Sequence, residues 1–374
     1  MGLRKGTVTF SRYRLAGTLA DGFPEFFNQR IRQNAFQISW RTADEQVSGW
    51  VGLEDPLDKD FAYASYAQGR YLLFSLRIDR KTLPPALFRL RCLEAERKRL
   101  AESDQKKLYR EQREALREAV RLELLAKTLP VPSIFEICWS VPGQTLLFSS
   151  LSEKRFEDLQ VLFRDSFQLA LIPYLPWESP TETTSKVLQG GKTPTVLEAQ
   201  QMPPGVDPAI VGREFLTWLW FKSEDQGGTL SVSGENPIGV TFLRRLVLES
   251  GEGEYAEQIV CSGLHADLKE GKEALRQGKK ITAARLRLSQ DKTEWEFTFK
   301  ADRFYFQSLK LPTFPEQERD ETDREGQLLE RIYLIERPAQ LMDILFQSFL
   351  EVRLSKGWEG EQQRLLKWIS LNEG

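Results

Sequence analysis

Hydrophobic residues in the first 177 positions recur with two different periods. Apolar side chains in residues 7–15, 46–53 and 70–78 follow strand-like patterns, whereas residues 23–31 and 153–166 place large apolar groups every three or four positions. A period near two is typical of a strand, and a period near 3.6 is typical of a helix. This part of the chain is therefore predicted to mix strands with a few helices.

Residues 84–129 carry a long helical pattern with few apolar positions. The leucines are too sparse for a helix that is buried along its whole length. Ser103 and Asp104 have short polar side chains that suit a turn or a cap, so we predict two helices that break near these residues. Because a helix of about twenty residues is ~30 Å long, the pair would project from the body as an antiparallel hairpin. Pro130 and Pro132 are predicted to end it.

The composition of the chain changes after this region. Residues 178–209 are rich in Pro, Thr, Gly and Gln, which is typical of a linker or a surface excursion. Residues 210–374 again combine strands with helices, and Pro338 is expected to divide the last helical region in two. Since no regular β-α-β alternation occurs, the predicted fold class is α+β, with two domains that each mix antiparallel sheet and helix. The domains are residues 1–177, which include the projecting hairpin 84–129, and residues 210–374.

The hairpin region segregates positive charge in a chain whose net charge is −2 at pH 7. Residues 77–127 contain fifteen Lys and Arg against nine Asp and Glu, whereas residues 313–374 contain thirteen acidic and eight basic residues. A local excess of positive charge indicates an anionic partner.

The remaining composition narrows the class of protein. Hydrophobic residues make up 41% and charged residues 28% of the chain, as in ordinary globular proteins. Three widely spaced cysteines, without a CxxC pair, indicate buried thiols in a reducing compartment. The N-terminus lacks the apolar core of a signal peptide, and the apolar run 167–177 is broken by two prolines. We therefore expect a cytoplasmic protein with no membrane partner.

No residue pattern predicts catalysis, a metal site or a cofactor. His265 is the only histidine, and a single histidine before a short helix is most often a cap or a surface residue. Residues 190–193, with the sequence GGKT, resemble the end of a phosphate-binding loop. However, Lys186 stands where that loop needs glycine, and Pro194 stands where it must open a helix. The chain is therefore predicted not to be an enzyme.

The remaining candidate chemistry is binding by cations near the predicted bend of the hairpin. Such cations could meet successive phosphates of a nucleic acid. The alternative is a solvated hairpin laced by ion pairs such as Glu114 with Arg117 and Arg113 with Glu94, each worth only ~0.2–0.5 kcal/mol. The candidate DNA-binding residues are Arg97, Lys98, Arg99, Lys106, Lys107, Arg110, Arg113 and Arg117.

Seven segments in a fixed order resemble a known family. They are SRYRL at residue 11, GWVGLEDPLD at 49, YLLFSLRIDRKTLPPALF at 71, KKLYREQREALREAV at 106, LPVPSIFEICW at 129, GREFLTWLWFKSE at 212 and LLERIYLIERPAQLMDILFQSFLEVR at 328. In this order they are similar to the recombination-associated protein RdgC family, and most of all to its longer members.

This resemblance implies a non-catalytic, nucleoid-associated protein that binds double-stranded DNA with little sequence preference. It further implies a horseshoe-like subunit that pairs into a ring-shaped homodimer and restrains, or competes with, a RecA-type recombinase. A basic inner surface and an acidic outer one would reconcile DNA binding with a net charge of −2. The main alternative is a protein-interaction scaffold that uses the charged hairpin without binding DNA. A nuclease is the least favoured reading.

The sequence departs from the short members of that family at two places. Where those members carry an aromatic residue and arginines after the long helices, this chain has Thr128, Leu129, Pro130, Val131 and Pro132. Where they carry a Lys-Gln pair, this chain has His265 and Ala266. No DNA contact is carried over to either place.

Overall fold

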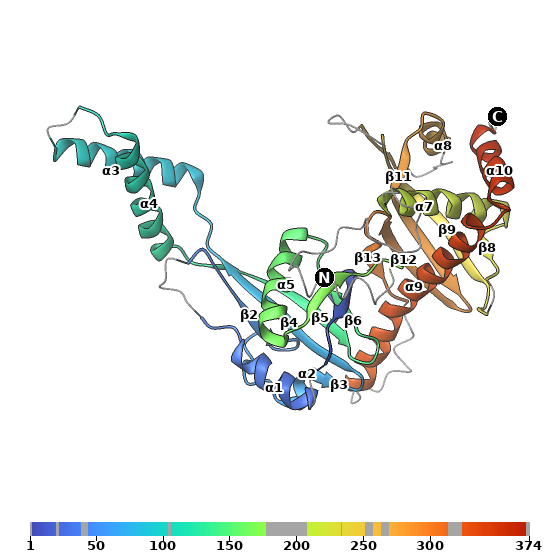
Figure 1. Ribbon diagram of the computed structural model, residues 1–374, viewed down its shortest axis with the longest axis horizontal. Coiled ribbons are helices and arrows are strands. Elements are labelled where there is room, and N and C mark those ends of the chain that lie inside the picture. Colours follow the sequence, from blue (N-terminus) through green and yellow to red (C-terminus); the bar gives the residue numbers. More distant parts are fainter. Residues whose placement is uncertain are drawn as a thin grey trace.

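The computed structural model shows an α+β fold, as predicted from the sequence. One antiparallel sheet extends through the molecule, and helices pack against parts of its faces (Figure 1). The structure describes residues 2–19, 22–38, 44–103, 106–176, 208–232, 234–250, 257–262, 269–312 and 324–371. Most of the predicted linker 178–209 lies outside these residues.

Within the described ranges the sheet has thirteen strands, in the order β10-β9-β11-β12-β13-β1-β6-β5-β4-β2 along its main path. Three short strands pair at its sides: β3 with β4, β7 with β1, and β8 with β9. The strands are β1 (Val8–Ala16), β2 (Gln46–Gly52), β3 (Ala67–Gln68), β4 (Tyr71–Arg80), β5 (Val131–Ser140), β6 (Thr145–Phe148), β7 (Ala170–Pro173), β8 (Thr229–Leu230), β9 (Ile238–Glu249), β10 (Gln258–Ser262), β11 (Lys280–Gln290), β12 (Thr293–Lys300) and β13 (Tyr305–Lys310).

Strand β1 joins the two halves of the sheet. Its first residues pair with β13, with Val8 opposite Leu309, and its later residues pair with β6, with Ser11 opposite Phe148. From Tyr13 onward it also pairs with β7. One short strand therefore binds strands from both ends of the chain into one sheet.

The N-terminal half has an aromatic core between the sheet and three helices, α1 (Phe23–Gln33), α2 (Tyr63–Tyr66) and α5 (Glu153–Phe167). Phe27 and Phe167 stack with ring centroids 4.8 Å apart, and Trp50 and Trp139 lie against Phe167. Trp50 is fully buried, and its indole N–H donates to Ser166 Oγ at 2.8 Å. Burial of these large rings holds α1 and α5 on one face of the sheet.

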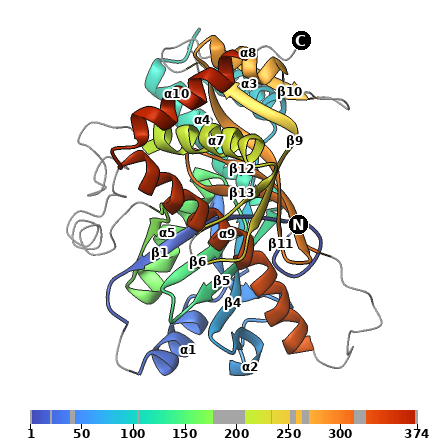
Figure 2. The same cartoon turned by 90° about the vertical axis from the view of Figure 1, so that its right-hand side faces the viewer.

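A second core forms around α7 (Pro208–Asp225) and α9 (Arg324–Arg353). The helices α8 (Lys269–Arg276) and α10 (Trp358–Ser370) complete this half. The core also takes in Phe10, Leu73 and Cys138 from the N-terminal half. Helix α9 therefore packs against strands from both halves, as Figures 1 and 2 show.

The prediction that Pro338 divides the last helical region is wrong, because α9 runs through this proline without a break. A proline inside a helix removes the N–H that would bond to the carbonyl four residues earlier, here Leu334. The indole N–H of Trp295 donates to that carbonyl at 2.9 Å instead. A residue of β12 thus replaces the missing helical hydrogen bond.

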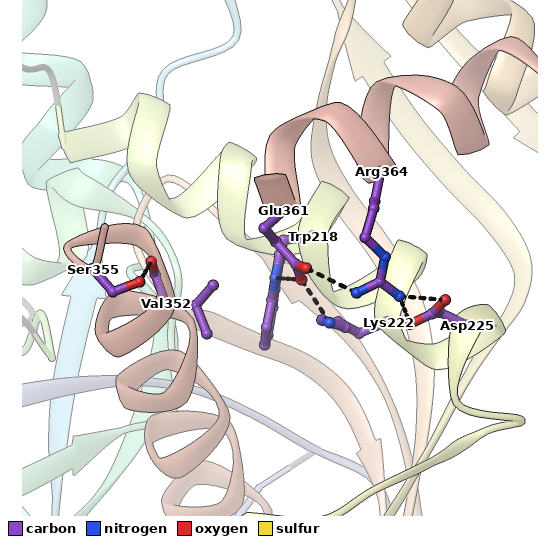
Figure 3. Close-up of polar contacts among 7 residues, drawn as sticks. All are labelled: Trp218, Lys222, Asp225, Val352, Ser355, Glu361 and Arg364. Atoms are coloured by element: carbon purple, nitrogen blue, oxygen red, sulfur yellow. Dashed lines mark hydrogen bonds and ion pairs between the residues drawn. The ribbon is translucent and has the colours of Figure 1, made fainter. Parts of the chain in front are cut away.

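Helix α10 is held to α7 by a cluster of charges around the buried carboxylate of Glu361 (Figure 3). The carboxylate of Glu361 accepts from Lys222 Nζ at 2.6 Å, from the Trp218 indole at 3.1 Å and from Arg364 at 3.3 Å. Arg364 also pairs with Asp225 at 2.7 Å. Because each buried charge has partners, the cluster fixes α10 in place without leaving an unpaired ion in the core.

Candidate nucleic-acid interface

The predicted hairpin is an arm made of two helices, α3 (Pro85–Ala101) and α4 (Arg110–Lys127). It projects from one end of the sheet (Figure 1). The break falls between Ala101 and Arg110, as the short polar side chains predicted. A proline opens α3, and at the start of α4 the Tyr109 N–H donates to the Gln112 side chain at 3.0 Å, which caps the helix.

Few apolar contacts hold the two helices of the arm together. Leu108, Val120 and Leu125 are buried, whereas α3 has no buried residue. A cleft of about 440 Å³ lies along the arm and is lined by residues that include Cys92, Arg113 and Arg117. Burial raises the pKa of the Cys92 thiol, and the charge of Arg117 opposes this effect.

The base of the arm is fixed by polar contacts that the sequence did not predict. The buried Lys81 donates from Nζ to the Leu125 carbonyl at 2.9 Å, near the C-terminal end of α4. A cation suits this position because the helix dipole is negative there. Arg121 pairs with Glu45, which is distant in sequence. The sequence could not predict these two contacts, because the two residues of each contact are more than forty positions apart in the chain.

All eight predicted DNA-binding residues are exposed, and all lie on the outer part of the arm. Arg97, Lys98 and Arg99 are in the last turns of α3, and Lys106 and Lys107 are in the connection between the helices. Consecutive residues of a helix point about 100° apart, so the three on α3 cannot all face the same ligand surface. The remaining three, Arg110, Arg113 and Arg117, are on α4.

Two of the eight cations are already paired. Arg110 pairs with Glu114 at 3.0 Å, and Arg113 pairs across the hairpin with Glu96 at 3.4 Å. The pairs predicted from the sequence, Glu114 with Arg117 and Arg113 with Glu94, are therefore wrong in their partners. Glu94 instead pairs with Arg91 along α3 at 2.9 Å. Such exposed pairs stabilise the arm only weakly.

The other six cations are not neutralised locally. These six are Arg97, Lys98, Arg99, Lys106, Lys107 and Arg117. Within the part of the chain that the structure describes, no carboxylate lies within ion-pair distance of any of these side chains. Long, exposed and unpaired side chains can each reach a separate phosphate. This arrangement favours a polyanion over a small ligand, since the charges are spread over two helices and their connection.

The other residues that the sequence analysis considered lie outside the arm or outside the described residues. Leu129 follows α4 with its side chain 77% exposed, and Pro132 is part of β5. His265, Ala266 and the GGKT segment at 190–193 lie outside the described residues. Among the residues that are described, no three His, Cys, Asp or Glu side chains gather closely enough to hold a metal ion. Likewise, no described helix is both long and apolar enough to cross a bilayer.

The fold and the arm define an α+β protein with one large antiparallel sheet and a projecting basic hairpin. A family model described as "Putative exonuclease, RdgC" matches residues 10–202, which is just over half of the chain. The chain therefore belongs to the RdgC family, and this membership indicates a recombination-associated protein. The match contains most of β1, the whole arm and β7. A search of curated proteins gave no match.

Proposed function

We propose that this protein binds double-stranded DNA without sequence preference and that the arm supplies phosphate contacts. The observation that carries the proposal is the set of six exposed arm cations that have no carboxylate partner among the described residues. Phosphate contacts position a protein on a duplex but carry no base information, so an arm of this kind binds unrelated sequences alike. The function requires no catalytic group.

The wider proposal is a homodimer that closes around DNA and restrains a RecA-type recombinase at the nucleoid. The open outline of the subunit between the arm and the C-terminal half supports it (Figure 1). So do Leu87, Leu90 and Leu93, which are exposed along α3 and offer apolar surface to a second subunit. Sedimentation of the free protein should give twice the mass of the chain, and a monomer at all concentrations would contradict this part of the proposal.

The same three leucines favour a second candidate function, in which the arm is a docking site for another protein and DNA plays no part. The two functions separate in one experiment, because protein docking survives nuclease treatment and gives no DNA mobility shift. A nuclease would instead degrade DNA in a manner that depends on a divalent cation. Incubation of labelled duplex with the protein and Mg²⁺ tests this nuclease hypothesis.

The DNA proposal predicts a steep salt dependence. Each phosphate contact contributes about −0.9 to the slope of log affinity against log salt. Because the three cations on α3 cannot all face one duplex, at most five of the six unpaired cations bind it together, which gives a slope of roughly −4 to −5. Titration of several unrelated duplexes at different salt concentrations measures this slope. A flat salt response, or no binding at about 50 mM salt, would contradict the proposal.

Removing four arm cations should weaken binding to every duplex alike. In the variant Arg97→Ala, Lys98→Ala, Lys106→Ala, Lys107→Ala, we expect the slope to become shallower by roughly 3 to 4, because four phosphate contacts are lost. The matched control replaces one exposed Arg and three exposed Lys away from the arm: Arg244, Lys292, Lys356 and Lys367. If both variants lose affinity equally, the effect is one of net charge and the arm is not the contact surface.

A further inference from the structure

The C-terminal half of the sheet has a polar groove that lies outside the arm. It has a volume of about 820 Å³, and its walls come from β9, β10, β11, β12 and β13 and from the segment before α5. Its basic lining residues are Arg245, Arg285, Lys300 and Arg303, and its acidic lining residues are Glu249 and Asp302.

This groove is on the face of the half-sheet that the helices leave open. Helices α7, α9 and α10 cover the opposite face, which is turned away from the arm in both views (Figures 1 and 2). The buried side chains of β9 follow the same division, since Leu246 and Leu248 enter the core while Arg245 and Glu249 line the groove. The groove and the arm therefore border the same open space.

The two carboxylates of the groove are already neutralised by a cation from α7. Arg213 forms a bidentate pair with Asp302 at 2.8 and 2.7 Å, and its guanidinium also lies 4.0 Å from Glu249. Glu249 further accepts from Gln258 at 2.9 Å. The side chain of Arg213 is only 17% exposed, so it balances these acids without itself being open to a large ligand.

The basic residues of the groove are less well compensated. Among the described residues, no carboxylate lies within ion-pair distance of Arg245 or Lys300, and both side chains are exposed. Arg303 pairs with the exposed Glu153, and Arg285 lies 3.6 Å from Glu296 and donates to the Ser308 carbonyl. The groove thus presents net positive charge, and Thr298, Gln307 and Ser308 add polar lining between the cations.

We propose that this groove is a second phosphodiester-binding surface, in which Arg245 and Lys300 contact phosphates of the same duplex that the arm holds. Arg213 is a positioning residue that keeps Asp302 and Glu249 from repelling the backbone. The identity of the polyanion rests on the proposed function, whereas the position of the site rests on the groove alone. No sequence pattern predicted this surface, because its residues come from five strands and are distant in sequence.

The first test compares two double variants of the full-length protein. Arg245→Ala with Lys300→Ala should lower duplex affinity about tenfold near 100 mM salt and make the salt slope shallower by roughly 2, because two phosphate contacts are lost. The matched control is Arg244→Ala with Lys292→Ala, which removes one Arg and one Lys from exposed positions of the same half-sheet outside the groove lining. It should stay within twofold of the wild type.

The outcomes separate this inference from the proposed function. If the wild type binds no duplex, the proposed function fails. If the wild type binds and the arm variant is weakened while the groove variant stays within twofold, only the groove inference fails. It also fails if the groove variant loses binding of polyglutamate but not of duplex, since the groove would then serve an acidic protein.

A second test examines the positioning role of Arg213. Arg213→Gln should weaken duplex binding although this side chain does not contact the DNA, because two carboxylates become uncompensated inside the groove. Adding Asp302→Asn and Glu249→Gln should restore at least half of the lost affinity on a logarithmic scale. A purely structural role of Arg213 would show no such rescue, and the thermal melt of each variant reports whether it is folded.

Discussion

Replacing Asp343 by Ala is expected to destabilise the protein by about 3–5 kcal/mol, because it leaves the buried Arg12 without its charge partner. Arg12 on β1 and Asp343 on α9 form a bidentate pair at 2.6 and 2.7 Å. Burial opposes the charge on Arg12, but the charge and hydrogen bonds of Asp343 outweigh it, so the pKa of the guanidinium is raised. Tyr174 completes the site, since its hydroxyl donates to Asp343 at 3.1 Å and its ring lies 4.2 Å from the guanidinium carbon.

Denaturant titration followed by circular dichroism measures this effect. The double variant Arg12→Met, Asp343→Leu should recover most of the stability, because replacing both buried charges by apolar groups of similar size is often close to neutral. Glu94→Ala, which breaks the exposed pair with Arg91, should change stability by less than about 1 kcal/mol. A loss below about 1 kcal/mol for Asp343→Ala would mean that water replaces the missing carboxylate.

The position of this ion pair explains why its loss should strongly destabilise the protein. Arg12 lies in the strand that joins the two halves of the sheet, and Asp343 lies in the helix that packs on both. The sequence predicted the strand at residues 7–15 from its own alternation, and the structure has it at Val8–Ala16. Its joining role could not be predicted, because Leu309 and Phe148, its partners in the two halves, follow it by more than 130 residues.

The arm shows a similar division between local and distant information. Its two helices and their break follow from local features, namely the prolines, the sparse leucines and the polar turn. The ion pair across the hairpin was predicted with the wrong partner, because it depends on how the two helices are rotated about their axes. A shift by two residues, from Glu94 to Glu96, is enough to place the acid on the side that faces Arg113.

The C-terminal half was predicted less completely. Strand β13 (Tyr305–Lys310) and helix α10 were not identified from the sequence. Only a four-residue turn separates β13 from β12, and β13 itself is only six residues long. The groove was missed for a related reason, since neighbouring strands bring its cations together only after folding.

The helix that continues through Pro338 leads to a second mutation with a large expected effect on stability. Sequence rules place a helix boundary at a proline because the carbonyl four residues earlier loses its donor. Here Trp295 is 2% exposed and supplies that donor to Leu334 from a neighbouring strand. Trp295→Phe should therefore cost about 1–3 kcal/mol for the buried carbonyl left without a partner, in addition to the cost of the smaller ring.

A double-mutant cycle with Pro338→Ala isolates the hydrogen bond from the packing loss. Alanine at position 338 restores a backbone N–H that can bond to the Leu334 carbonyl within the helix. Trp295→Phe should then cost less in the Pro338→Ala background than in the wild type, with a coupling energy of about 1–2 kcal/mol measured by denaturant unfolding. Additivity within about 0.5 kcal/mol would mean that the indole contributes only its volume. In that case the continuity of α9 through Pro338 would rest on its burial between the two halves of the sheet, where Leu334, Ile335 and Ala339 enter the core.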